Sequence, residues 1–590
     1  THATDRTHEE NKEMIRSLIT ASAIFLTLIL SNSTAPAQII KGAAAEPRHE
    51  VRAVWLTTLS GLDWPSKPAT TEEGARQQRQ ELCRILDKLQ QAGINTVLFQ
   101  SRIRSTTAYP SAIEPWDAAF TGTPGKAPLY DPLAFAIEEC HKRHMELHAW
   151  VVAFPICKVA VEKRLGKQAL PRKHPELCRR CGDQWMMDPG VPATGDYLAR
   201  ICEEIVRRYD VDGIHLDYIR YPEESIPWND RDTYRKYGQG MAVSAWRREN
   251  VTSVVRKINH VVKDIRPWVK ISCSPIGKHA DLPRQSSYGW NARDAVHQDA
   301  QKWLREGLMD MLFPMMYFDG RHFYPFAQDW QEQSAGRPVV PGLGIYFLSP
   351  REKNWPLGTV ARQMQFTRLT GMGGQAFFRS RFFTDNVKGL YDFASTDFYT
   401  RPALIPPMTW ADSISPAPPH VKMERNGYEF QLTWQPVSDN TPGVPVTYNV
   451  YRLAHDTDTL TFDQSTLLAQ GLKETTFRYA PLLPRTRNSR HAVTAVDAYG
   501  NESPLTATSN VVSLPSAAQN IPTTKDGYLS LPADTPEAPF YLVTDLAGRA
   551  VMTIPATQKP NLSSLMPGHY ELRTLGKRGV SHRIMYFRKE

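Results

Sequence analysis

The sequence predicts an α/β protein built on a (β/α)8 TIM barrel, followed by an all-β sandwich and a small β-rich C-terminal domain. Two observations predict the barrel: eight short apolar runs between residues 51 and 378, and amphipathic stretches with helical spacing between them. Runs rich in Val, Ile and Phe without strict alternation are typical of strands buried on both faces. Eight such strands separated by helices indicate a closed barrel rather than an open sheet.

The predicted elements alternate along residues 49–400, which we take as the barrel domain. Strands are expected at residues 51–59, 95–101, 146–154, 213–218, 270–274, 309–317, 338–346 and 374–378. Helices are expected at residues 76–92, 132–144, 194–209, 245–265, 294–306 and 358–369. The number of strands carries the prediction, because merging two of the runs would leave too few to close a barrel.

The chain of 590 residues is too long for one compact core, so further domains are expected beyond the barrel. Six prolines within residues 401–419 predict a linker. Residues 420–515 then alternate as strands do, and the pattern around Trp434 and 447–452 resembles a fibronectin type III domain. The last segment, 521–590, is short and β-rich. Its stretches 541–549 and 565–572 resemble the C-terminal sorting domain of a secretion system used by the Bacteroidota.

The N-terminal region carries the pattern of a secretory signal peptide at residues 14–37. Arg16 precedes an apolar run over residues 18–30, and the small residues Ala35-Pro-Ala37 come directly before Gln38. The run is short for a membrane span, so an anchor is the less favoured interpretation. We therefore expect an exported protein, periplasmic, cell-surface or extracellular, without an integral membrane segment after signal cleavage.

Charge and cysteine content exclude some classes of partner and leave others open. The formal charge of +9 is modest for this length and no block of five or more like charges occurs, which argues against a nucleic-acid partner. Three of the seven cysteines, Cys157, Cys178 and Cys181, lie close in sequence. A lone C-x-x-C favours a disulfide or free thiols over a structural metal. We expect no cofactor and no catalytic metal.

The candidate chemistry lies in the segment Gly213-Ile-His-Leu-Asp-Tyr-Ile-Arg-Tyr-Pro222. Side chains at the carboxyl ends of barrel strands point into the active site, and Asp217 ends the fourth predicted strand. Glycosyl transfer needs two carboxyl groups, one as proton donor and one as nucleophile or base. Asp217 supplies one of them. The second remains open among four residues: Asp319, Glu223, Glu224 and Glu114. We take Asp217, Asp319 and Glu223 as the catalytic candidates.

Other polar and aromatic residues within or just after the predicted strands describe a basic and aromatic rim around Asp217. The predicted substrate-binding residues are Arg102, His148, Trp150, His215, Arg220, Tyr317, Tyr346 and Arg379. Each of them alone is more often structural than functional. Together they fit a polyhydroxylated substrate, either neutral or anionic, so the predicted partner is a polysaccharide.

Residues 49–400 resemble a known family, the glycosyl-hydrolase-like family ten of bacterial exported proteins. The matching stretches include Glu50-Val-Arg-Ala-Val-Trp-Leu-Thr-Thr58, Gly93-Ile-Asn-Thr-Val-Leu-Phe-Gln-Ser-Arg102, His148-Ala-Trp150, Met187-Asp-Pro-Gly190 and the segment around Asp217. The resemblance implies a TIM barrel acting on glycan, with the glycan strands of bacterial peptidoglycan as the best family-level substrate. Many members carry two adjacent acids at this point of the chain, whereas here Tyr218 follows Asp217.

Two other functions stay open at this stage. The protein could hydrolyse another polysaccharide, such as an α-glucan or a plant glycan, or it could bind glycan without cleaving it. A second carboxyl group within about 5 to 10 Å of Asp217 would favour an enzyme over a binding protein. The sequence leaves the linkage cleaved, the stereochemical outcome and the oligomeric state open.

Overall fold

The computed structural model describes residues 46–589 apart from 286–288, 427–428, 454–459, 463–464, 480–489, 514–522, 525–526, 532–534, 536, 546–548 and 576–580. The chain divides into two compact units, Thr1–Pro406 and Pro407–Glu590. The signal peptide predicted at residues 14–37 lies outside the described residues. Among the residues that are described, no helix has the length and apolar character needed to cross a bilayer.

Eight parallel strands form the centre of the first unit, one for each predicted run. They are β1 (Val51–Leu56), β2 (Thr96–Arg102), β3 (Glu146–Val152), β7 (Gly213–Asp217), β8 (Lys270–Cys273), β9 (Met311–Leu312), β10 (Gly342–Leu343) and β11 (Gly374–Phe377). Hydrogen bonding joins them in the order β10-β11-β1-β2-β3-β7-β8-β9. Parallel bridges Leu312↔Val339 and Met315↔Gly342 then join the last strand to the first, so the sheet closes into a TIM-barrel-like ring.

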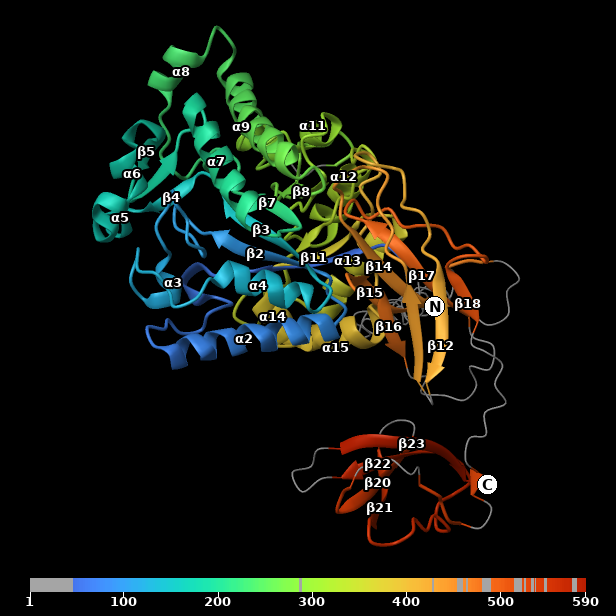
Figure 1. Ribbon diagram of the computed structural model, residues 1–590. Helices are drawn as coiled ribbons and strands as arrows, with labels where there is room; N and C mark the ends of the chain where they lie inside the picture. The colour runs from blue at the N-terminus through green and yellow to red at the C-terminus, as the bar shows by residue number, and fades with distance from the viewer. Residues whose placement is uncertain are drawn as a thin grey trace, which may run out of the picture. The chain divides into compact units, whose positions relative to one another are not determined.

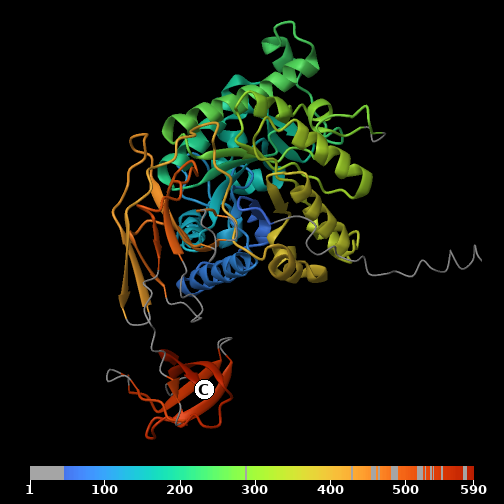
Figure 2. The same ribbon diagram turned by 90° about the vertical axis from the view of Figure 1, so that its right-hand side faces the viewer.

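Helices alternate with these strands and lie outside them (Figures 1 and 2). They are α2 (Glu72–Gln91), α3 (Ala118–Thr121), α4 (Pro132–His141), α7 (Pro192–Arg208), α8 (Arg231–Tyr237), α9 (Val243–Ile265), α10 (Ala292–Ala295), α11 (Ala300–Arg305), α12 (Tyr324–Glu332), α13 (Leu357–Leu369), α14 (Ser380–Thr384) and α15 (Leu390–Asp392). The single helix expected over residues 294–306 is wrong. The chain breaks between α10 and α11, where His297 has a left-handed φ of 58°. Helix α12, which the sequence analysis did not predict, buries Phe326, Ala327 and Trp330.

The barrel strands bury side chains on both faces, which explains their uninterrupted apolar runs. In β1, Ala53 and Trp55 point into the barrel, where they pack with Leu98, Trp150 and Phe313. The alternate residues Val54 and Leu56 point outward and pack beneath the helices. The barrel interior is therefore a packed core.

An insertion between β3 and α7 forms a small antiparallel sheet of order β4-β6-β5. It contains β4 (Pro155–Lys158), α5 (Val159–Leu165), α6 (Leu170–Lys173), β5 (Cys178–Cys181) and β6 (Gln184–Met187). Because it follows β3 directly, it stands on the side of the barrel to which the carboxyl ends of the strands point (Figure 1). Strands β4 and β5 carry Cys157, Cys178 and Cys181, and all seven cysteines of the chain are described as free thiols.

In its described residues, the second unit contains three sheets; two are antiparallel and the C-terminal one is mixed, because one of its strand pairs is parallel. Strands β12 (Val421–Asn426), β13 (Glu429–Trp434) and β16 (Thr476–Tyr479) form one; β15 (Thr466–Leu472), β14 (Val446–Arg452), β17 (Arg490–Asp497) and β18 (Val511–Ser513) form another. Trp434, Tyr448 and Val493 pack between these two sheets. The fibronectin type III assignment itself stays a prediction. The C-terminal sheet contains β19 (Thr523–Thr524), β23 (Ser581–Lys589), β22 (Gly568–Leu575), β20 (Phe540–Asp545) and β21 (Ala550–Pro555).

Candidate active site

Asp217 ends β7 at the mouth of the barrel and is held by three hydrogen-bond donors. Its Oδ1 accepts a hydrogen bond from Ser274 Oγ (2.8 Å) and one from the backbone N–H of Tyr218 (2.8 Å). Its Oδ2 accepts one from Trp150 Nε1 at 3.1 Å. Trp150 lies on β3 and Ser274 follows β8, so both neighbouring strands fix the carboxyl group. Of the predicted binding residues, Trp150 is thus brought into direct contact with Asp217.

Burial raises the pKa of the Asp217 carboxyl above its ordinary value. Ser274, Arg220, Tyr218 and Trp150 oppose this rise because each favours the ionised form, and burial nevertheless dominates. A carboxyl group with a raised pKa keeps its proton to higher pH, which is the property required of a proton donor. The three donors also fix the orientation of the group.

His215 lies one layer deeper in the barrel than Asp217. Trp55 Nε1 donates to His215 Nε2 at 3.1 Å, so the ring proton resides on Nδ1 and is donated to Ser272 Oγ at 3.0 Å. Burial, followed by the charge of His148, holds the pKa of His215 well below its usual range. The neutral ring uses both nitrogens within the core. His215 was predicted to bind substrate, but its contacts are structural: it belongs to the packed layer beneath Asp217.

His148 lies near the amino-terminal end of the barrel, away from the mouth. It pairs in register with Gly213, the first residue of β7, whereas Val152 pairs with Asp217. Its ring is fully buried, and its Nε2 lies 3.1 Å from Glu146 Oε2. The strand pattern indicated correctly that His148 points inward, but its depth argues against contact with substrate.

Arg102 also differs from the prediction, because it forms a closed ion pair with Glu114. The two side chains meet through Nε–Oε2 (2.8 Å) and Nη2–Oε1 (2.6 Å), and both are buried. Tyr197 donates to the same carboxylate, and Arg102 Nη1 donates to the carbonyl of Ala153 (2.8 Å). This cluster ties the end of β2 to the end of β3. Because their hydrogen-bonding groups are used within this cluster, Arg102 is not available to bind substrate and Glu114 is not available as a second acid.

Arg220 and Glu223 lie in the loop after β7, beside Asp217. Arg220 Nη2 donates to Glu223 Oε1 at 3.3 Å, and the Arg220 guanidinium lies 4.7 Å from the centre of the Tyr218 ring. Burial raises the pKa of Tyr218, Asp217 and Glu223 add to the rise, and Arg220 acts against it. Arg220 thus contacts both Glu223 and the Tyr218 ring. Glu224 is exposed in the same loop.

Tyr317 follows β9 and lies on the mouth side of the barrel. Its ring stacks on Phe378 at 5.3 Å and meets Tyr346 edge-on at 5.8 Å. Burial and then the charge of Asp217 raise the pKa of Tyr317, which indicates that the phenol lies near that carboxyl group. Burial raises the pKa of Tyr346 to about 12. Asp319, two residues further along, is exposed and contacts none of the other candidate residues in the part of the chain that is described.

Arg379 follows β11 and forms an ion pair with Asp63, a residue that the sequence analysis did not single out. Arg379 also donates to the carbonyl of Leu62 at 2.8 Å, while the backbone N–H of Thr57 donates to Asp63 Oδ2 at 2.9 Å. The pair thus fastens the loop after β1 to the end of β11. Its contacts give Arg379 a structural role.

Ser274, Tyr218 and Trp290 were not predicted as site residues, and all three lie at the mouth. Ser274 donates to Asp217, while Trp290 lies 5.9 Å from the Arg220 guanidinium. The spacing of Ser272 and Ser274 held a usable signal: two hydroxyl residues at alternate positions of a strand share one face. Small hydroxyl residues are common in any strand, which makes that signal weak.

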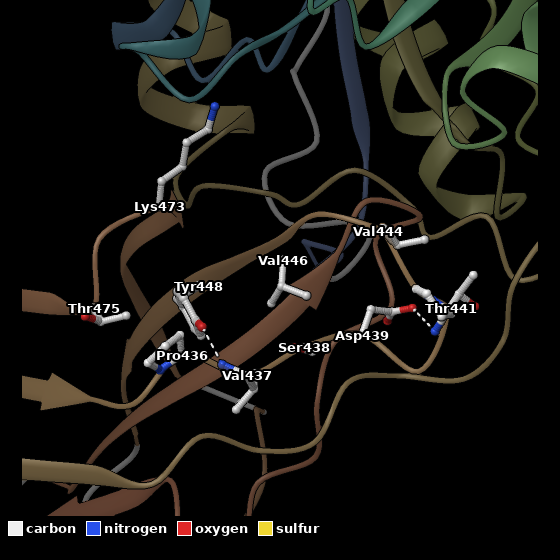
Figure 3. Close-up of a pocket in the computed structure, with 12 residues that line it drawn as sticks. Pro436, Val437, Ser438, Asp439, Thr441, Val444, Val446, Tyr448, Lys473 and Thr475 are labelled. Carbon is white, nitrogen blue, oxygen red and sulfur yellow. Dashed lines mark hydrogen bonds between the residues drawn. The ribbon is translucent and has the colours of Figure 1, made fainter.

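A groove in the second unit is a less suitable place for chemistry. It lies between the loop at residues 436–444 and the turn at residues 473–475 (Figure 3). Asp439 is the one acidic side chain that lines it, and Lys473 the one basic side chain. The backbone N–H of Val437 donates to the Tyr448 hydroxyl in its wall at 3.0 Å. With one carboxylate, the groove lacks the pair of acids that glycosyl transfer needs.

Fold and site together define the class of this protein: a TIM-barrel-like α/β protein with a buried carboxyl group at a mouth lined by aromatic and basic side chains. Residues 50–342 match the family described as "Glycosyl hydrolase-like 10". Over 437 residues the chain is 33% identical to "Glycosyl hydrolase YngK" of Bacillus subtilis (strain 168), covering 70% of this chain and 84% of that protein. The chain belongs to the glycosyl hydrolase-like 10 family.

A second relative and a solved structure are also similar to part of this chain. "Glycosyl hydrolase DigH" of Escherichia coli (strain K12) is 34% identical over 342 residues, covering 52% of this chain and 76% of that protein. The solved glycoside hydrolase domain of PgaB (BpsB) from Bordetella bronchiseptica covers 59% of this chain and 98% of that chain. Its sequence identity is 14% and its TM-score is 0.41.

Proposed function

We propose that this protein is an exported glycoside hydrolase that cleaves the glycan strands of bacterial peptidoglycan, with Asp217 as its general acid. The observation that carries the proposal is the buried Asp217 carboxyl, whose pKa is raised by burial at the mouth of the barrel. The names of two relatives, both called glycosyl hydrolases, support the reaction class. The peptidoglycan substrate rests on the family resemblance of the sequence.

The contacts of Asp217 support Oδ2 as the atom that carries the transferable proton. Oδ1 accepts two hydrogen bonds, from Ser274 and the Tyr218 backbone, so both of its lone pairs are engaged. Oδ2 accepts one hydrogen bond, from Trp150, and keeps one lone pair for a proton. In this proposal Oδ2 donates its proton to the leaving glycosidic oxygen.

Glu223 is the second carboxyl group that the site supports best, with Asp319 as the alternative. Glu223 is bonded to Arg220, and both Glu223 and Asp217 act electrostatically on the phenol of Tyr218. Its side chain is 41% exposed, so it is accessible to the water that an inverting mechanism activates or to the sugar that a retaining mechanism attacks. Comparison of Glu223→Gln with Asp319→Asn distinguishes the two residues.

The rest of the chain is assigned by the same proposal. Residues 14–37 direct export, and the protein acts in the periplasm, at the cell surface or outside the cell. The sandwich of strands β12–β18 is a fibronectin type III-like spacer or binding module, and two packed antiparallel sheets support that assignment. The C-terminal sheet is the sorting domain that the sequence pattern indicates.

A panel of glycans tests the proposed function. Purified protein is incubated with peptidoglycan glycan strands, an α-glucan and a plant glycan, and newly formed reducing ends and soluble fragments are measured. We expect release from peptidoglycan strands. Release only from another polysaccharide would overturn the substrate assignment. Binding to glycan without any release would identify a binding protein instead of an enzyme.

The pH profile of Ser274→Ala tests the role of Asp217 as a protonated acid. The Ser274 hydroxyl stabilises the ionised carboxylate, so its removal raises the pKa of Asp217 further. Because the acid is active while it holds its proton, the alkaline limb of kcat/KM should move to higher pH. Turnover at the optimum should fall by no more than about tenfold, the effect of losing one hydrogen bond.

Ser272→Ala is the matched control for that experiment. It removes the same group from the same face of the barrel, but its hydroxyl contacts His215 instead of Asp217. Its alkaline limb should stay where that of the wild-type protein lies. An unmoved limb in Ser274→Ala would contradict the assignment of Asp217 as the acid that sets it.

A further inference from the structure

Arg220 is a buried guanidinium with unused hydrogen-bonding capacity. It is 4% exposed, and its one polar contact in the described residues is the 3.3 Å hydrogen bond from Nη2 to Glu223 Oε1. Its Nε is buried without a partner in that part of the chain. A guanidinium carries five N–H donors, and leaving a buried donor without an acceptor is unfavourable. An acceptor supplied by a ligand would remove that deficit.

Two aromatic rings that reach solvent flank this guanidinium. The Arg220 Cζ atom lies 4.7 Å from the centre of the Tyr218 ring and 5.9 Å from that of Trp290. Trp290 is 46% exposed and Tyr218 is 37% exposed, although both are large aromatic residues. Exposed rings beside a charged group that is itself buried are typical of a binding site, because the rings supply contact area and the charge supplies specificity.

The charge of a second guanidinium, that of Arg104, also affects the pKa of Tyr218. Arg104 lies at the tip of the turn after β2, which the hydrogen bond from Ile103 N to Thr106 O (2.9 Å) closes. The charges of Arg104 and Arg220 both lower the pKa of Tyr218, against the dominant effect of burial. Within the described residues Arg104 forms no ion pair. Glu223 is the one acidic side chain bonded to Arg220 in the part of the chain that is described.

We propose that Arg104 and Arg220 form an anion-binding subsite beside Tyr218 that takes the carboxylate of an acidic sugar unit in the glycan. The sugar ring lies against Trp290 and Tyr218, and its carboxylate accepts hydrogen bonds from the guanidinium groups. This inference rests on the proposed function and deepens it. It assigns the substrate to the carboxylate-bearing glycans and excludes neutral ones such as α-glucans.

Chemically matched glycans test the Arg104–Arg220 subsite. The probes are peptidoglycan glycan strands freed of peptides, and the same strands after their sugar carboxylates have been converted to amides. Wild-type protein should turn over the native strands with a kcat/KM at least about tenfold above that of the amidated strands, since a charge-assisted hydrogen bond is lost. Arg220→Gln and, separately, Arg104→Gln should each reduce that ratio toward one by lowering kcat/KM on native strands alone.

Binding measured by titration calorimetry with Asp217→Asn keeps the test independent of turnover. Native strands should bind this variant more tightly than amidated strands. Equal binding and equal turnover of the two probes would overturn the subsite and leave the proposed hydrolase intact. Tighter binding of native strands without any cleavage by wild-type protein would support the subsite and overturn the hydrolase. Arg76→Gln, an exposed arginine of α2, is the control that should leave the ratio unchanged.

Discussion

Asp217→Asn should lower turnover on glycan strands by at least about 100-fold, the lower end of the contribution of acid–base catalysis. An amide cannot deliver a proton to the leaving oxygen at neutral pH. Asn has nearly the same size as Asp, and it still accepts hydrogen bonds through one oxygen. Binding of the glycan should therefore survive. The measurement compares kcat on native strands with glycan affinity and with thermal melting of the same preparations.

The predicted outcome differs from that of a purely structural carboxylate. A structural Asp217 would give a variant with a lower melting temperature whose folded fraction retains near-wild-type turnover. That combination would contradict the assignment. Asp183→Asn is the control: this aspartate is exposed between β5 and β6, its side chain being 78% accessible, and its substitution should change neither turnover nor melting.

Glu114→Gln should reduce the free energy of unfolding by about 3 kcal/mol or more, because it leaves the buried Arg102 charge uncompensated. The loss would be larger than that from a typical surface substitution, since both partners are removed from solvent and the pair also holds Tyr197 and the Ala153 carbonyl. Denaturant unfolding followed by tryptophan fluorescence measures the change. The folded variant should keep its glycan affinity, because both side chains of the pair are buried and bonded to each other.

Glu73→Gln provides the comparison for this stability prediction. Glu73 pairs with Arg76 on the exposed face of α2, where both side chains are more than half accessible. Exposed ion pairs contribute little to stability, so its unfolding midpoint should be indistinguishable from that of the wild-type protein. A midpoint for Glu114→Gln that matches the control would contradict the structural role of the Arg102–Glu114 pair. Loss of glycan binding in folded protein would assign that pair to the site.

The eight strands were predictable because a strand that is buried on both faces has a continuous run of apolar residues. Helix α12 was not, because its nine residues include Pro325 and too few apolar positions to define a period. The helix predicted over residues 294–306 failed at a backbone feature: the left-handed conformation of His297 has no apolar signature. The spacing of apolar residues and the composition thus identify long elements. Short or interrupted elements are determined by local backbone geometry, which these patterns do not show.

The sequence predicted which side chains of the candidate site point into the barrel, but not how far each lies from the mouth. His148, His215 and Asp217 all point into the barrel, as alternation implies, yet they occupy successive layers and one of them lies at the mouth. Arg102 and Arg379 end their strands as expected, but each is neutralised by an acid from a distant loop, Glu114 or Asp63. Such pairs depend on how loops fold back, which residue spacing along a single chain does not reveal.

The layer of Trp55, His215 and Phe313 beneath Asp217 has a consequence for the way a polymer approaches. Trp55 and Phe313 meet the His215 ring edge-on at 5.8 and 5.3 Å, and all three side chains are almost fully buried. This layer closes the barrel beneath Asp217, so a polymer chain cannot pass through the barrel. Under the proposed function, a glycan therefore reaches Asp217 only from the mouth side of the barrel. Selection among glycans then depends on the side chains at the mouth, because the packed interior offers no passage.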